Sequence, residues 1–118
     1  MIKYALGMRM ETSTVLKDIN RRIIKNFLDI LILAEIRNGP LSGYDIISFI
    51  HNKFSLLVSS GTVYSTLYAL ERDGLISGTW NHRKRVYRYT EKGEETIKTI
   101  LNANDKIQYL VTNLLKGQ

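Results

Sequence analysis

The chemically most distinctive residues of this sequence are cations that stand close together in its C-terminal half. Arg83, Lys84 and Arg85 form an uninterrupted basic run, and Arg88 follows three residues later. Residues 74–90 contain these four basic side chains and no acidic one. Across the whole chain, 17 Lys and Arg outnumber 11 Asp and Glu, for a formal net charge of +6. Because guanidinium and ammonium groups bind phosphate oxygens, this distribution predicts an acidic partner such as nucleic acid.

Side chains that could support catalysis or bind a metal ion are scarce. The sequence has no cysteine, which excludes disulfides, thiolate zinc sites and cysteine nucleophiles. It has two histidines, His51 and His82, and neither belongs to a Ser-His-acid or phosphate-cradling pattern. We therefore expect no enzymatic activity, no metal ion and no cofactor.

Length and hydropathy indicate the general class of protein. A chain of 118 residues suits one compact domain. No uncharged apolar segment approaches the roughly 18 residues that a membrane span needs, and the N-terminus lacks the pattern of a secretory signal. Together with the lack of cysteine, these features predict a cytoplasmic protein.

Hydrophobic spacing predicts the helices that position the basic run. Apolar residues recur at spacings of three and four from Ile19 to Ala34, which predicts a helix over about 19–38 that ends at a Gly-Pro pair. Ser42 and Asp45 have the spacing of a capping box, so a second helix is expected over about 44–53.

A third helix is expected to begin after Ser59 or Ser60 and to end at Gly74. Its buried stripe would consist of Val63, Leu67 and Leu70. Its outward side chains are small, neutral or basic, namely Thr62, Ser65, Thr66, Ala69 and Arg72. No acidic residue occurs between Ile46 and Leu70, so this helix face would tolerate a polyanion.

The remaining residues predict a hairpin and a final helix. Residues 75–80 and 85–89 are rich in β-forming side chains, and the basic run lies at the turn between them. Thr90 would cap a helix that carries a heptad pattern, with Ile97, Asn104 and Val111 at one position and Ile100, Ile107 and Leu114 at the other. Such a stripe predicts a dimer interface whose central Asn sets the register; the alternative is a stripe that packs within its own domain.

The order of these elements predicts a mostly helical α+β fold. Three helices, a two-stranded hairpin and a long helix make up a winged helix-turn-helix with a C-terminal dimerisation helix. We divide the chain into an N-terminal extension (1–18), a winged-helix domain (19–90) and the dimerisation helix (91–118). In such a fold the third helix can enter the major groove while the hairpin reaches phosphates.

Four motifs in this order resemble PadR-type transcriptional regulators. They are LSGYDI at 41–46, GTVYSTL at 61–67, LERDGLI at 70–76 and YRYTEKG at 87–93. The resemblance covers about residues 26–100 and suggests a short-form member. It implies that the second motif opens the recognition helix, where Ser60 stands in place of the family's usual proline.

The resemblance also implies which residues meet DNA. The expected DNA-binding residues are Ser60, Thr62, Tyr64, Ser65 and Thr66 on the recognition helix and Arg83, Lys84 and Arg85 on the wing. Family members are dimers, many are repressors, and some are released by aromatic or hydrophobic compounds. We therefore expect double-stranded DNA, a second copy of the chain and a small effector of this kind as partners.

The leading hypothesis is a homodimeric, sequence-specific DNA-binding regulator, a repressor acting on a near-palindromic operator. The alternative is a winged-helix adaptor that binds protein without specific DNA recognition. We expect Tyr87 in the core and Tyr64 in a mixed role, with its ring packed and its hydroxyl near phosphate. The cations Arg21, Arg22 and Lys25 form either an ordinary solvated helix start or a second phosphate contact.

Overall fold

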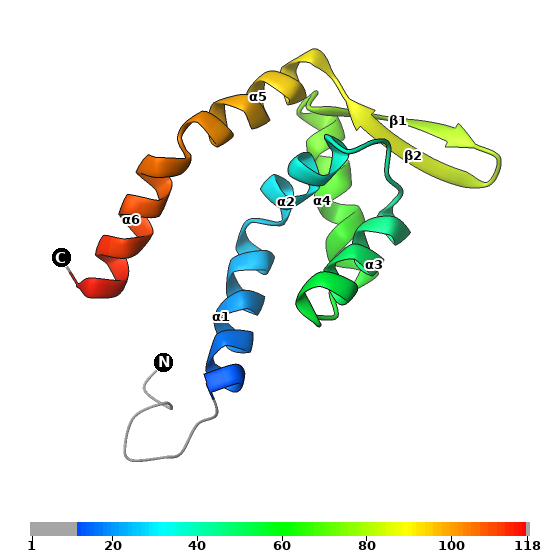
Figure 1. The fold of residues 1–118 in the computed structure, drawn as a ribbon. Helices are drawn as coiled ribbons and strands as arrows, with labels where there is room; N and C mark the ends of the chain where they lie inside the picture. The colour runs from blue at the N-terminus through cyan, green and yellow to red at the C-terminus, as the bar shows by residue number, and fades with distance from the viewer. Residues whose placement is uncertain (1–11, 118) are drawn as a thin grey trace.

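The computed structural model describes residues 12–117, in which the chain forms six helices and one two-stranded antiparallel sheet (Figure 1). The elements are α1 (Thr12–Asn26), α2 (Leu28–Ile36), α3 (Gly43–Phe54), α4 (Ser60–Arg72), β1 (Ile76–Asn81), β2 (Lys84–Tyr89), α5 (Glu91–Asn102) and α6 (Asn104–Lys116). This is the winged helix expected from the sequence. Most of the predicted N-terminal extension, residues 1–11, lies outside the described residues.

The predicted first helix over 19–38 is two helices, and this expectation is corrected. Helix α1 begins at Thr12, and the backbone leaves helical geometry at Phe27, where φ is −115° and ψ is 27°. Helix α2 then carries four buried residues in nine and lies in the core, whereas α1 leaves the body of the domain (Figure 1). The apolar spacing continues through the break, so the sequence pattern did not indicate the change of direction.

Polar side chains start α3 and α4 as predicted. The Ser42 hydroxyl accepts from the backbone N–H of Asp45 at 3.1 Å, and the Asp45 carboxylate accepts from the backbone N–H of Ser42 at 2.9 Å. Ser59 caps α4 by accepting from the backbone N–H of Thr62 at 3.1 Å. Gly74 ends this helix segment with a φ of +78°, which glycine adopts at little cost. These caps fix where α4 begins and ends.

The two strands form the wing around a short turn at His82 and Arg83. Asn81 pairs with Lys84 and Ile76 with Tyr89, so the strands match along their full length. His82 has a φ of +58°, a positive value of the kind that two-residue hairpin turns need at their first position. Leu41 extends the sheet, because its backbone exchanges hydrogen bonds of 3.2 and 2.8 Å with Tyr87.

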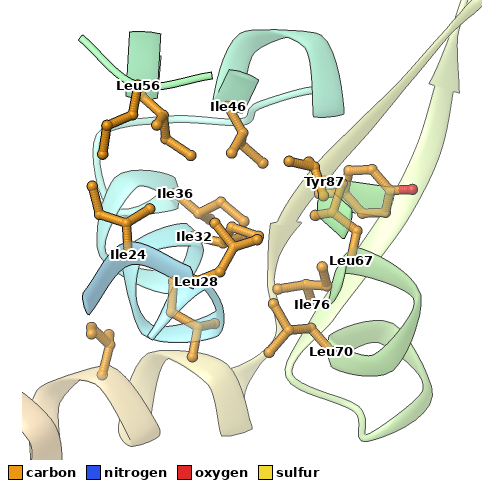
Figure 2. Packing of buried hydrophobic residues seen from close by; sticks show 14 residues of the cluster. Ile24, Leu28, Ile32, Ile36, Ile46, Leu56, Leu67, Leu70, Ile76 and Tyr87 are labelled. Carbon is orange, nitrogen blue, oxygen red and sulfur yellow. The ribbon is translucent and has the colours of Figure 1, made fainter. Parts of the chain in front are cut away.

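One hydrophobic cluster joins the C-terminal part of α1 with α2, α3, α4, the wing and α5 (Figure 2). Its buried members are Ile24, Leu28, Ile32, Leu33, Ile36, Ile46, Ile50, Leu56, Val63, Leu67, Leu70, Ile76, Tyr87 and Ile97. The three predicted buried residues of α4 are among them, and so is Tyr87, which confirms its expected core position. The cluster therefore holds the inner face of α4 and leaves its other face outside.

The C-terminal segment, expected as one helix, is divided at Ala103 into α5 and α6. Ala103 has a φ of −92° and a ψ of 8°, and the two helices follow different directions (Figure 1). Helix α5 is tied to the core by Ile97, whereas no residue of α6 is buried. Among the described helices, none has the length and hydropathy to cross a membrane.

Candidate nucleic-acid interface

Helix α4 presents an exposed face that carries no acidic side chain. Gly61, Thr62, Ser65 and Tyr68 are exposed along it, opposite the buried stripe. The first turn of α4 holds no acidic residue, and Arg72 lies in its last turn. A helix of about 10–12 Å diameter fits the B-DNA major groove, which is about 12 Å wide. The outer face of α4 has the size and polarity to enter such a groove.

The hydroxyl groups on α4 differ in whether they already make hydrogen bonds within the protein. Ser59 donates to the Thr62 hydroxyl at 2.8 Å, and Thr66 donates to the Thr62 carbonyl at 2.9 Å. Thr66 is half-buried, whereas Ser60 and Ser65 are exposed. The Ser65 hydroxyl makes no hydrogen bond to another described residue, while the Thr66 proton is used within the helix.

Tyr64 lies against the start of α3. A Cβ atom added at Gly43 would stand 2.5 Å from two carbons of the Tyr64 ring, so the ring occupies the space that a side chain at Gly43 would need. The side chain of Tyr64 is still 47% exposed, so one part is packed and the other reaches solvent. The ring is packed as expected, but the packed part includes the hydroxyl end, because Oη lies 2.8 Å from the same Cβ position; the contact of the hydroxyl with phosphate stays a prediction.

Two exposed aromatic residues on this side of the domain were missed in the sequence reasoning. Tyr68 is 70% exposed and stands one helical turn after Tyr64, and Tyr44 is 68% exposed near the start of α3. The signal for Tyr68 was its i, i+4 spacing from Tyr64 on the same helix face. Exposed aromatics beside a neutral helix face are suited to contact sugars or bases.

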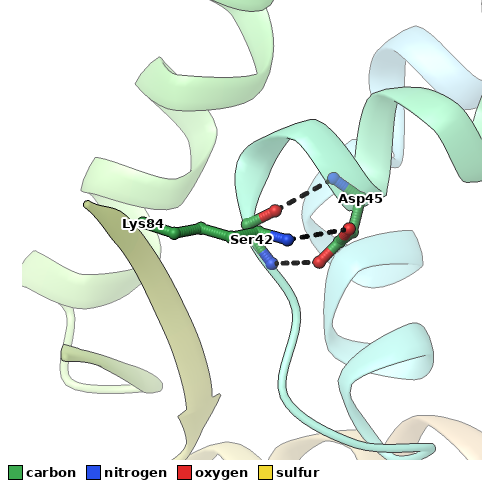
Figure 3. A network of polar contacts seen from close by, with 3 residues as sticks. All are labelled: Ser42, Asp45 and Lys84. Carbon is green, nitrogen blue, oxygen red and sulfur yellow. Dashed lines mark hydrogen bonds and ion pairs between the residues drawn. The ribbon is translucent and has the colours of Figure 1, made fainter. Parts of the chain in front are cut away.

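The basic run of the wing divides into three environments. Arg83 stands at the exposed turn and makes no ion pair among the described residues. Lys84 lies 3.5 Å from the Asp45 carboxylate, with its side chain 51% exposed (Figure 3). Arg85 is turned toward the domain and pairs with Glu71 at 2.8 Å. Successive strand residues point to opposite faces, so neighbouring cations meet different partners.

The capping box of α3 stabilises the charged form of the Asp45 carboxylate, which faces Lys84. The backbone N–H of Ser42 lowers the pKa of Asp45, partial burial opposes this effect, and Lys84 adds to the lowering. Asp45 is therefore ionised at neutral pH and holds one wing cation near the domain. The contact is exposed, so a phosphate oxygen can compete for the ammonium group.

Two of the α1 cations lie beside the start of α4. Arg21 and Lys25 line a hollow together with Ser59 and Thr62. The first-turn N–H groups of a helix carry a partial positive charge, so this corner combines several positive groups. Among the described residues, no group of three or more His, Asp or Glu could hold a metal ion.

The predicted dimer residues divide at Ala103. Ile97 is 1% exposed and belongs to the domain's own core, and Ile100 packs against that core. For Ile97 the structure therefore supports the alternative reading of the stripe, in which it packs within its own domain. Asn104 is the first residue of α6, where its side-chain oxygen accepts from Gln108 at 3.1 Å.

Beyond Ala103 the stripe is exposed. Ile107, Val111 and Leu114 are 43%, 46% and 71% exposed, and Leu110 and Leu115 widen the patch. Helix α1 also carries exposed apolar side chains, Leu16 and Ile23, and the exposed Phe27 follows at the break before α2. We call these two sets of residues the apolar faces of α6 and α1.

One protein-family profile matches the chain. Residues 32–99 match the profile described as the Transcriptional regulator PadR-like family. A PadR-like regulator of Bacillus cereus is 26% identical, with 82% of this chain and 99% of that chain covered and a TM-score of 0.67. A PadR family regulator of Eggerthella lenta shares the fold at 19% identity, with 89% and 96% covered and a TM-score of 0.71.

A third solved structure contains nucleic acid. Bacillus subtilis PadR in complex with operator DNA is 28% identical and has a TM-score of 0.56. The match covers 63% of this chain and 46% of that one. No curated protein sequence matches the chain.

Proposed function

Because this chain belongs to the PadR-like family of transcriptional regulators, we propose that it is a sequence-specific DNA-binding repressor that acts as a homodimer in the cytoplasm. The observation that carries the proposal is the neutral, exposed outer face of α4 beside the basic wing. The similarity to a PadR solved with operator DNA supports the same conclusion. Helix α4 would read base edges, and the wing would neutralise phosphates.

The proposed base-reading and phosphate-binding residues are mostly those predicted from the sequence; Tyr68 is added, and Arg85 is left out because it pairs with Glu71. Ser60, Thr62, Tyr64, Ser65 and Thr66 lie on α4 in chain order, and the structure adds Tyr68. On the wing, Arg83 and Lys84 are the proposed phosphate contacts. Arg21 and Lys25 extend the positive surface to the start of α4, which favours their role as a second phosphate contact.

Two exposed apolar faces support the homodimer. The apolar faces of α6 and α1 belong to the helices that project from the domain, and neither is covered within the described residues (Figure 1). Burial of exposed Leu, Ile and Val side chains against a second copy lowers the free energy and so stabilises a dimer. Two α4 helices related by a two-fold axis would meet half-sites about 34 Å apart on a near-palindromic operator.

A small aromatic or hydrophobic effector is the proposed regulator. A hollow lined by Ile23, Phe27, Ile30, Leu31 and Phe54 has an almost wholly apolar wall and shares Ile23 and Phe27 with the apolar face of α1. An aromatic compound bound there would alter the position of α1 and with it the spacing of the two α4 helices. Addition of a simple phenolic acid to the protein–DNA complex in a gel-shift assay tests this release.

Selection of bound sequences from random DNA tests the central proposal. We expect a consensus with two-fold symmetry and half-sites one helical turn apart. Binding without any sequence enrichment, at low salt as well as physiological salt, would contradict the proposal and favour the protein-interaction adaptor.

A further inference from the structure

Glu71 joins the last turn of α4 to both strands of the wing. Its Oε2 atom accepts from the backbone N–H of Gly78 in β1 at 3.1 Å. The same oxygen accepts from Nη2 of Arg85 in β2 at 2.8 Å. One carboxylate therefore binds the two strands of the hairpin to the proposed recognition helix.

The guanidinium of Arg85 is held on several sides in this arrangement. A Cβ atom at Gly78 would lie 2.7 Å from Nε of Arg85, so the guanidinium occupies the space that a side chain there would need. The Cζ atom of Arg85 lies 5.6 Å from the Trp80 ring centroid and 5.7 Å from that of Tyr87. The side chains of Arg85 and Glu71 are 31% and 32% exposed, so solvent screens this pair less than the pair of Lys84 and Asp45.

We infer that Glu71 and Arg85 are positioning residues for DNA binding, which set the angle between the wing and α4; this inference rests on the proposed function. Charge-assisted hydrogen bonds are stronger than neutral ones and depend on geometry. A wing held at the correct angle loses little freedom when α4 and the wing bind DNA together. Glu71 thus strengthens binding to a polyanion although it carries the same sign of charge.

Arg85 was predicted to contact phosphate, and its pairing with Glu71 gives it a positioning role instead. Arg85 acts by holding the wing, whereas Arg83 and Lys84 face outward to phosphates. The two roles give opposite results for Glu71. If Arg85 contacted phosphate directly, Glu71 would compete with DNA for the guanidinium, and its removal would tighten binding.

The test compares Glu71→Gln, Arg85→Lys and Arg85→Met with the control Glu95→Gln, which removes one exposed acidic charge from α5. Affinity for the selected operator is measured at several salt concentrations. We expect Glu71→Gln and Arg85→Lys to weaken binding by about fivefold to tenfold with an unchanged salt slope, because a charged hydrogen bond is lost but no phosphate contact is. Glu95→Gln should leave binding unchanged or slightly tighter.

Two readouts on the protein alone keep this test independent of the proposed function. Amide hydrogen exchange at Gly78 should become faster in Glu71→Gln, because its acceptor is weakened. Fluorescence anisotropy of Trp80, the single tryptophan of the chain, should fall as the wing gains motion. If the wild-type protein bound no DNA, the function would fail, while these readouts would still report whether Glu71 holds the wing.

Two sets of results would contradict the positioning role of Glu71 and Arg85. Tighter operator binding by Glu71→Gln, together with a salt slope reduced by about one in Arg85→Met, would make Arg85 a phosphate contact and Glu71 its competitor. Unchanged exchange at Gly78 and unchanged Trp80 anisotropy in Glu71→Gln would show that the carboxylate does not hold the wing.

Discussion

The carbonyl oxygen of Leu75 lies 1.9 Å from the position that a Cβ atom would occupy at Gly93. The first turn of α5 therefore lies directly on the backbone that enters β1. The backbone N–H of Thr90 donates to the same carbonyl at 3.1 Å, and the Thr90 hydroxyl donates to the carbonyl of Gly74 at 2.6 Å. This contact sets where α5 leaves the winged domain and hence the direction in which α6 is carried.

Gly93→Ala tests this contact. The added methyl group would overlap a backbone atom that cannot rotate away, so we expect the free energy of unfolding to fall by about 1–3 kcal/mol or more. Urea unfolding followed by circular dichroism measures the change. Gly61→Ala is the matched control, because nothing lies within 4 Å of a Cβ atom there. Equal stability of the two variants would contradict the close approach.

Asp45 predicts a dependence of stability on pH. The pKa of Asp45 in the folded protein is lowered, chiefly by the N–H of Ser42, from an ordinary value of 3.8. Its contribution to stability is therefore present above that ordinary value and is lost as the pH falls through the lowered one. The stability advantage of the wild type over Asp45→Asn should shrink between pH 5 and about pH 2, measured by urea unfolding. A constant difference across this range would contradict the capping interaction.

Arg83→Ala tests the outward cation of the wing. Loss of one phosphate contact should weaken binding to every DNA sequence and reduce the slope of log affinity against log salt by about one. Fluorescence titration at several salt concentrations measures this slope. Lys106→Ala removes an exposed cation from α6 and should leave the slope unchanged. An unchanged slope in Arg83→Ala would remove the turn of the wing from the interface.

Ser65 and Thr66 should differ although they are neighbours on α4. Ser65 is exposed, whereas Thr66 is half-buried and donates its proton to the Thr62 carbonyl. We expect Ser65→Ala to alter the base preference at one position of each half-site and Thr66→Ala to alter it less. Selection from random DNA at fixed salt compares the three proteins. The same consensus for Ser65→Ala and wild type would show that Ser65 does not read bases.

Substitution of Ile107 should weaken the dimer, whereas substitution of Ile97 should lower the stability of the folded domain. Ile107→Glu places a charge on the exposed apolar face of α6 and should raise the dimer dissociation constant at least about tenfold, measured by analytical ultracentrifugation. Ile97→Ala should instead lower the free energy of unfolding by about 2–5 kcal/mol, because Ile97 is buried in the domain's core. A dimer unaffected by Ile107→Glu would place the interface elsewhere.

Features that depend on neighbours in the chain were predicted from the sequence. The capping box of Ser42 and Asp45, the cap of α5 at Thr90 and the left-handed stop at Gly74 all join residues within a few positions of one another. The hairpin and the buried stripe of α4 follow from periods of two and 3.6 residues. The order of these elements was enough to predict the winged helix and, through its motifs, the family.

The directions of helices and the partners of the cations were decided by the tertiary structure alone. A 3.6-residue period runs unchanged through the turns of the chain at Phe27 and Ala103, so two predicted helices are each divided in two. The hydrophobic period also does not show what a side chain packs against, so Ile97 was placed in the predicted dimer stripe although it is buried in the core.

The basic run is the clearest case of this division. Its composition alone indicated an acidic partner, since like charges gathered in one segment attract counter-charge wherever the segment lies. Two carboxylates decide which of these cations is open to such a partner. Asp45 faces Lys84 from 39 residues away in the sequence, and Glu71 binds Arg85 from 14 residues away. Only the packing of the wing against α3 and α4 brings these carboxylates within reach.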